Sequence, residues 1–66
     1  MIKLKSTNGY TVMVNPSNIC YMVSFKVPRG IITEIHFAGK TAIMVEQTIT
    51  QIESLIYKTT DQEEII

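Results

Sequence analysis

The sequence predicts an α+β fold: a five-stranded antiparallel β-meander followed by one C-terminal helix. Three observations lead to this prediction. Apolar and polar residues alternate in five short segments, turn residues separate these segments, and the alternation gives way to a helical period after residue 47. The pattern does not give the order of the strands in space. An open sheet and a half-open small barrel therefore both remain consistent with it.

The first two predicted strands, residues 2–6 and 10–14, form a hairpin whose register follows from their apolar stripes. A two-residue loop at the Asn-Gly turn would put the stripes on opposite faces of the hairpin. A three-residue loop pairs Leu4 with Val12 and merges the stripes on one face. We therefore predict a type I turn in which Gly9 is left-handed in a G1 bulge.

The Asn15-Pro16 step ends the second strand, because proline has no amide hydrogen to donate to a neighbouring strand. A long third strand, residues 19–27, follows, and its alternation predicts that Tyr21 and Phe25 point inward and Met22 outward. After a reverse turn at residues 28–30, strands are expected at residues 31–37 and 41–45. Thr33, Ile35 and Phe37 are expected to point inward, and residues 37–39 should repeat the first loop with Gly39 at the bulge.

Residues 48–51 match a capping box, in which Thr48 is the N-cap and Gln51 reaches back to it. Apolar residues then recur at helical spacing at positions 49, 52, 55 and 56, which predicts a helix to about residue 58. We expect one domain, residues 1–58, and a frayed acidic tail, residues 59–66.

Composition excludes several classes of protein. Cys20 is the only cysteine, so no disulfide can form within the chain, and with His36 as the only histidine a protein-only tetrahedral metal site is not expected. No cofactor is expected either. No apolar run has the length of a membrane span. A lone thiol and the absence of a signal-peptide pattern at the N-terminus predict a cytoplasmic location.

Only Cys20 and His36 could act as a nucleophile or a base near neutral pH. On the predicted strands both point to the outer face, where they could touch. No oxyanion-hole motif or glycine-rich loop accompanies them, so we expect neither an enzyme nor a small-molecule substrate. The simpler interpretation is a surface histidine and a small apolar filler.

A second apolar set lies on the predicted face away from the helix and has two interpretations. It could line the inside of a tightly curled barrel, or it could be an exposed patch that binds another chain. Methionine suits adaptable interfaces and a small core favours self-association, so we predict a protein-interaction module that forms homo-oligomers. The predicted interface residues are Met13, Cys20, Met22, Ile32 and Met44.

The alternative function is that of a small nucleic-acid-binding β-domain of bacterial or phage origin. Without residues 59–66, the chain has six basic and three acidic side chains, a net charge of +3. Small β-barrels that bind nucleic acid usually stack bases on aromatic side chains. Here the aromatic residues are expected to point mostly inward, which weakens this alternative. The possible phosphate contacts are Lys3, Lys5, Lys26, Arg29 and Lys40.

The chain also resembles the short flagellar FlbD-type proteins, the swarming motility SwrD group. The matching features are Ile2-Lys3-Leu4, Asn8-Gly9, Val14-Asn15-Pro16 with Ile19, Gly39-Lys40, and the junction Val45-Glu46-Gln47-Thr48-Ile49-Thr50-Gln51-Ile52. The resemblance covers about residues 1–57 and consists mostly of turn, cap and core positions. The family usually carries Glu at the positions of Gln47 and Gln51, and its turn corresponding to residues 24–30 is shorter. The resemblance implies a small non-enzymatic cytoplasmic protein that affects flagellar function.

Overall fold

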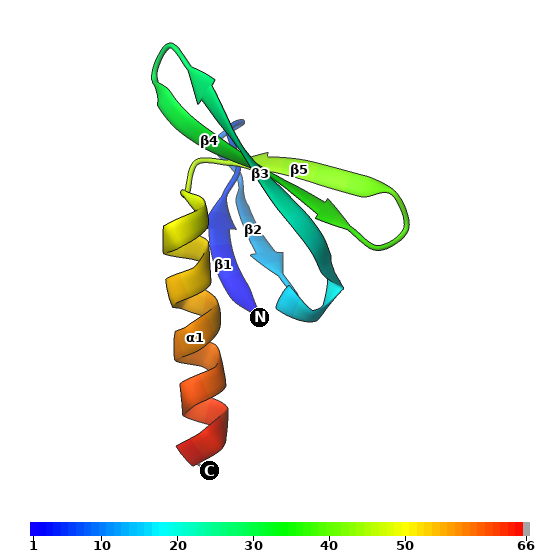
Figure 1. Cartoon of the computed structure of the whole chain (residues 1–66), viewed down its shortest axis with the longest axis vertical. Helices are drawn as coiled ribbons and strands as arrows, with labels where there is room; N and C mark the ends of the chain where they lie inside the picture. Colours follow the sequence, from blue (N-terminus) through cyan, green and yellow to red (C-terminus); the bar gives the residue numbers. More distant parts are fainter. Residues whose placement is uncertain (66) are drawn as a thin grey trace.

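The computed structural model describes residues 1–65, and the side chains of residues 1–58. It contains antiparallel strands in two sheets and one C-terminal helix, which extends beyond the strands (Figure 1). The predicted strand positions agree with the observed ones to within one residue at every end. The elements are β1 (Ile2–Lys5), β2 (Thr11–Val14), the 3-10 helix η1 (Pro16–Asn18), β3 (Ile19–Val27), β4 (Gly30–Phe37), β5 (Thr41–Val45) and α1 (Ile49–Ile65).

The single five-stranded meander of the sequence prediction is not confirmed, because the strands are divided between two sheets. One sheet has the order β1-β2 and the other the order β3-β4-β5. An isolated antiparallel bridge between Ser6 and Val45 joins them. Around it, the Thr7 N–H donates to the Met44 carbonyl at 3.1 Å and the Glu46 N–H donates to the Lys5 carbonyl at 2.9 Å. Residues 44–46 therefore pair with residues 5–7, a contact that the meander prediction did not include.

The first hairpin has the predicted register, with Leu4 opposite Val12. The Gly9 N–H donates to the Ser6 carbonyl at 3.0 Å, and the Ser6 N–H donates to the Tyr10 carbonyl at 2.8 Å. Gly9 has a φ of 89°, which a residue with a side chain adopts only at a cost. The merged apolar stripe and this glycine together fix the hairpin, as the sequence predicted.

The Asn15-Pro16 step forms a corner between the two sheets. The Asn15 side chain accepts a hydrogen bond from the Ser17 N–H at 3.1 Å, and its carbonyl accepts one from the Asn18 N–H at 3.0 Å. Proline at the first position of η1 suits a helix start, where its missing N–H would have no partner. The corner turns the chain from β2 into β3.

The predicted orientation of β3 is wrong, because the strand contains a β-bulge at Cys20. The register shifts between Ile19 and Tyr21, so the residues after the bulge point to the opposite face from the one predicted. Met22 lies opposite Ile35 and packs against the core, whereas Tyr21 is exposed. The two-residue turn at positions 28 and 29 sets this register, since it places Val27 opposite Gly30.

The loop between β4 and β5 lies one residue later than predicted. Phe37 pairs with Thr41, so the loop consists of Ala38, Gly39 and Lys40. Gly39 has the expected positive φ, at 90°, but Lys40 also adopts a positive φ, at 67°. As expected, Thr33 and Ile35 point inward and are fully buried, and Phe37 is half-buried against the core.

The capping box of α1 is confirmed. The Thr48 N–H donates to Gln51 Oε1 at 2.9 Å, and the Gln51 N–H donates to Thr48 Oγ1 at 3.2 Å. The helix continues to Ile65, past the predicted end near residue 58. Its polar second half contains no proline or glycine that would stop it. Residue 66 and the side chains of residues 59–65 lie outside the described part, so the expected fraying of residues 59–66 stays a prediction.

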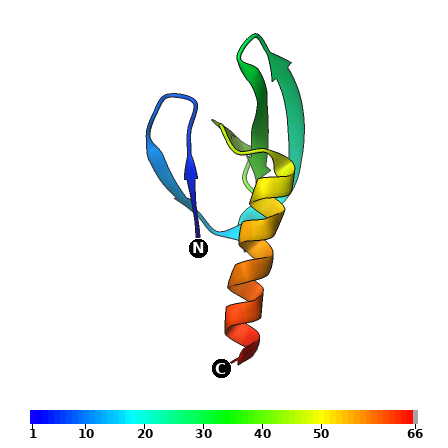
Figure 2. The same ribbon diagram turned by 90° about the vertical axis from the view of Figure 1, so that its left-hand side faces the viewer.

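The core lies between the two sheets and is closed by the helix, and Figure 2 shows the hairpin and the three-stranded sheet as separate layers. The hydroxyl of buried Thr33 donates to the Gln47 carbonyl at 2.7 Å, and Gln47 Oε1 accepts from the Lys5 N–H at 3.0 Å. Gln47 thus ties both sheets to the helix start. No helix within residues 1–65 is both long and apolar enough to cross a membrane. The buried apolar residues are Ile2, Leu4, Val14, Ile35, Val45 and Ile52.

Candidate protein-interaction face

The three-stranded sheet has an outer face that points away from the core. The pairing of β3, β4 and β5 arranges its side chains in cross-strand rows. In one row Tyr21 lies beside His36 and Ala42, in the next Val23 lies beside Glu34 and Met44, and Phe25 lies beside Ile32. We call this surface the outer face; it consists of Tyr21, Val23, Phe25, Ile32, Glu34, His36, Ala42 and Met44.

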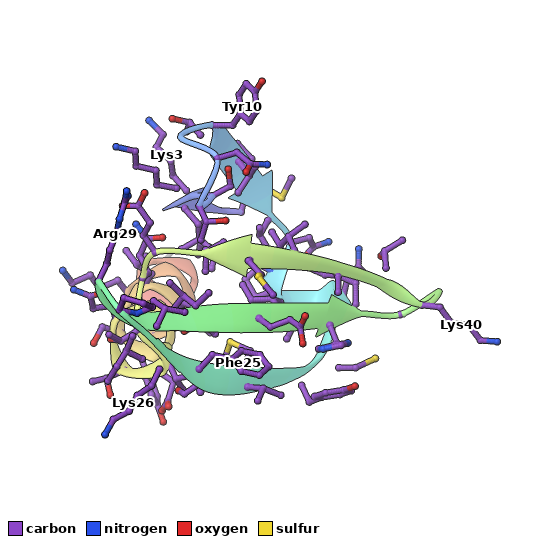
Figure 3. The ribbon with its side chains drawn as sticks, turned by 90° about the horizontal axis from the view of Figure 1, so that it is seen from above. Lys3, Tyr10, Phe25, Lys26, Arg29 and Lys40 are labelled. Atoms are coloured by element: carbon purple, nitrogen blue, oxygen red, sulfur yellow. The ribbon has the colours of Figure 1, made fainter. Side chains whose placement is uncertain are left out.

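The outer face exposes large apolar side chains. Tyr21 is 56% exposed, Met44 41% and Phe25 40%. Figure 3 looks onto the sheet from the side opposite the helix and shows Phe25 lying over the β3 ribbon. Aromatic and methionine side chains are enriched in the cores of protein interfaces, whereas charged residues are depleted there. The three most exposed apolar side chains of the outer face are therefore of the types that interface cores favour.

The only ionisable groups of the outer face besides the Tyr21 phenol are Glu34 and His36, and they bind each other. His36 Nε2 lies 2.8 Å from Glu34 Oε1, and the imidazole stacks on the Tyr21 ring with centroids 4.3 Å apart and an interplanar angle of 10°. Because a carboxylate only accepts hydrogen bonds, Nε2 carries the hydrogen in this contact. The three side chains form a preorganised unit in the middle of an otherwise apolar surface.

The structure does not bring the five predicted interface residues together. Ile32 and Met44 lie on the outer face, and exposed Cys20 lies in the bulge at the end of β3. Met13 is 54% exposed but belongs to the other sheet. Met22 packs against the core. Conversely, the sequence prediction missed Tyr21, Val23 and Phe25, although the two-residue turn after Val27 would have placed them on this face.

The two residues with nucleophile or base potential have different surroundings. Cys20 is exposed, and His36 is engaged by Glu34 and Tyr21. A groove of about 460 Å³ lies at the other end of the sheet, and neither residue lines it. Among the described residues, no three His, Cys, Asp or Glu side chains lie together as metal ligands would. The groove is lined by Thr7, Val27, Arg29, Gly30, Ile31, Ile32 and Glu46.

The possible phosphate contacts are spread over the molecule. Lys3 and Lys5 are exposed on β1, and Lys26 and Arg29 lie at the turn between β3 and β4. Lys40 projects from the opposite end of the sheet (Figure 3). A phosphate backbone is bound by clustered cations, so this distribution gives no support to the nucleic-acid alternative. Whether these residues contact phosphate stays a prediction.

Comparisons of the chain with protein-family models, with curated proteins and with solved structures found no match.

Proposed function

We propose that this protein is a small non-enzymatic interaction module that associates with copies of itself through the outer face. The exposure of Tyr21, Phe25 and Met44 on one side of a rigid sheet carries this proposal. Soluble monomers seldom leave contiguous apolar surface of this kind uncovered. The small core, with six buried apolar side chains among residues 1–58, would gain stability from a second chain laid over the sheet.

The charges of the outer face suit a second copy of the chain. A two-fold interface places the same surface on both sides, so a face with net charge would repel itself. Here the one carboxylate, Glu34, is already hydrogen-bonded to His36 within the same chain, and its charge is balanced whenever His36 is protonated. Two outer faces can meet without bringing an unpaired carboxylate against another.

The mass of the protein in solution, measured by size-exclusion chromatography with light scattering over a concentration series, tests the proposal. Met44→Lys places an ammonium in the outer face and should reduce the mass at a given concentration by about half. Met13→Lys is the matched control, because Met13 is even more exposed but lies on the other sheet. A Met44→Lys protein with the wild-type mass, or a wild-type protein that stays monomeric throughout, would contradict the proposal.

The resemblance to the FlbD-type proteins supports a role in flagellar function, which we propose as the process that this module serves. Deletion of the gene should reduce swarming while growth in liquid culture stays unchanged. Complementation with wild type should restore swarming, whereas complementation with Met44→Lys should not. Normal swarming of the deletion strain would contradict the flagellar role and leave the proposed interaction intact.

A further inference from the structure

Strand β3 has a free edge. It pairs with β4 on one side, and no strand within residues 1–65 pairs with it on the other (Figure 3). At nine residues it is the longest strand, and the opposite edge of its sheet is joined to β1 through the Ser6–Val45 bridge. The free edge of the other sheet is β2, which has only four residues and ends at the Asn15-Pro16 corner. β3 is therefore the edge best suited to accept a further strand.

The hydrogen-bonding groups at this edge follow from the register of the hairpin. Residues that flank a two-residue turn exchange hydrogen bonds, so Val27 directs its N–H and carbonyl groups toward Gly30. Because bonded and non-bonded pairs alternate along the strands, Phe25 and Val23 also bond to β4. Ser24 and Met22 therefore direct their backbone groups to the free edge.

The middle of the free edge of β3 lacks the features that prevent edge strands from pairing with other chains. Natural edge strands are protected by proline, by charged side chains, by bulges or by being short. In β3 the bulge at Cys20 and the charge of Lys26 lie toward the two ends. The five residues between them, 21–25, are uncharged and include no proline. This segment can form a regular ladder with another chain.

We propose that β3 pairs antiparallel with β3 of a second copy, about a two-fold axis at Val23. Val23 is the centre of the nine-residue strand, so this register overlaps the whole element. In this register Tyr21 of each copy lies opposite Phe25 of the other copy, so the same pair occurs once on each side of the axis. Aromatic cross-strand pairs stabilise antiparallel ladders, and they are closest at the non-hydrogen-bonded positions that these residues would occupy. The two three-stranded sheets become one six-stranded sheet.

This inference rests on the proposed self-association and adds a second, separate contact to it. Edge pairing joins sheets side by side, whereas the outer face joins them one above the other. Two different two-fold contacts on the same chain generate a tetramer if they close. Abolishing either contact alone should then leave a dimer, and abolishing both should leave a monomer.

The edge is tested in the Met44→Lys background, where the outer face no longer associates. The Met44→Lys protein should have twice the monomer mass, and adding Ser24→Pro should halve it. Proline is tolerated where a strand N–H points away from its neighbour, and circular dichroism verifies that the double variant is folded. A monomeric Met44→Lys protein overturns the edge contact while leaving the outer face in place. A folded double variant that keeps the dimer mass also overturns it.

A cross-link tests the register without relying on proline. Cys20→Ser removes the native thiol and Val23→Cys places one thiol at the proposed axis, both in the Met44→Lys background. Facing residues of a non-hydrogen-bonded pair have Cα atoms about 4.5 Å apart, within the range of a disulfide. Oxidation with diamide should convert most of the protein to a covalent dimer, whereas a control with Met13→Cys in place of Val23→Cys should stay mostly monomeric. Equal cross-linking of the two proteins overturns the register.

Discussion

The substitution Met22→Lys tests whether Met22 points outward, as the sequence predicted, or inward, as in the structure. Alternation along β3 predicted that Met22 is exposed, so that a lysine there would disperse an oligomer and leave the fold intact. In the structure Met22 lies opposite fully buried Ile35 and packs against the core, on the far side of the sheet from Met44. Met22→Lys should therefore destabilise the fold itself.

The size of the effect follows from the burial of Met22. Full burial of a methionine side chain contributes about 1.5–3 kcal/mol, so Met22, which is mostly but not fully buried, contributes about 1–2 kcal/mol. The lysine stem can lead its ammonium to water at the edge of the sheet, so desolvation adds no more than about 1 kcal/mol. The sum, about 1–3 kcal/mol, is a substantial part of the roughly 3–10 kcal/mol expected for 66 residues. At about 7 °C per kcal/mol, the midpoint of thermal unfolding should fall by about 7–20 °C.

Thermal unfolding followed by circular dichroism measures this shift, with Met44→Lys and Met13→Lys as controls that carry the same substitution. Because both control sites are exposed, each should change the stability of the protomer by less than about 0.5 kcal/mol. Melting at one low concentration, at which all proteins are monomeric, keeps association out of the comparison. A Met22→Lys protein that melts with the two controls would refute the inward orientation of Met22.

Two further predictions concern the junction between the sheets and the helix. Thr48→Ala removes the N-cap acceptor and should cost about 0.5–2 kcal/mol in urea unfolding, whereas Thr48→Ser should keep most of that stability; equal losses would refute the capping contribution. Thr33→Val leaves the Gln47 carbonyl without its donor and should cost about 1–3 kcal/mol in the same assay. A Thr33→Val protein as stable as the wild type would contradict this contribution of the Thr33 hydroxyl.

The features that the sequence predicted correctly are those set by neighbouring residues. The register of the first hairpin follows from two apolar stripes and the backbone freedom of Gly9, all within about a dozen residues. The capping box needs only Thr48 and Gln51, three positions apart. In both cases the interacting groups are close in sequence, so few other arrangements compete with the observed one.

The features that were missed depend on one displaced residue or on distant contacts. The bulge at Cys20 inverts every later side chain of β3, and simple alternation contains no sign of it. The two-residue turn after Val27 was the available signal, because it pairs Ser24 with Thr33 and puts Phe25 outside. The division into two sheets arises because β2 does not pair with β3, and the Ser6–Val45 bridge that joins the sheets could not be predicted, since it connects remote positions.

That bridge has a consequence for folding during synthesis. Ser6 and Val45 are 39 positions apart (45 minus 6), which a ribosome translating about 5–20 residues per second covers in about 2–8 s. A β-hairpin forms in about 1–10 μs, so β1 and β2 can pair long before β5 exists. For those seconds the side chains of Ile2, Leu4 and Val14 have no sheet or helix to cover them. The nascent hairpin therefore presents an apolar face to chaperones and to other nascent chains until the later strands and the helix have left the ribosome and covered it.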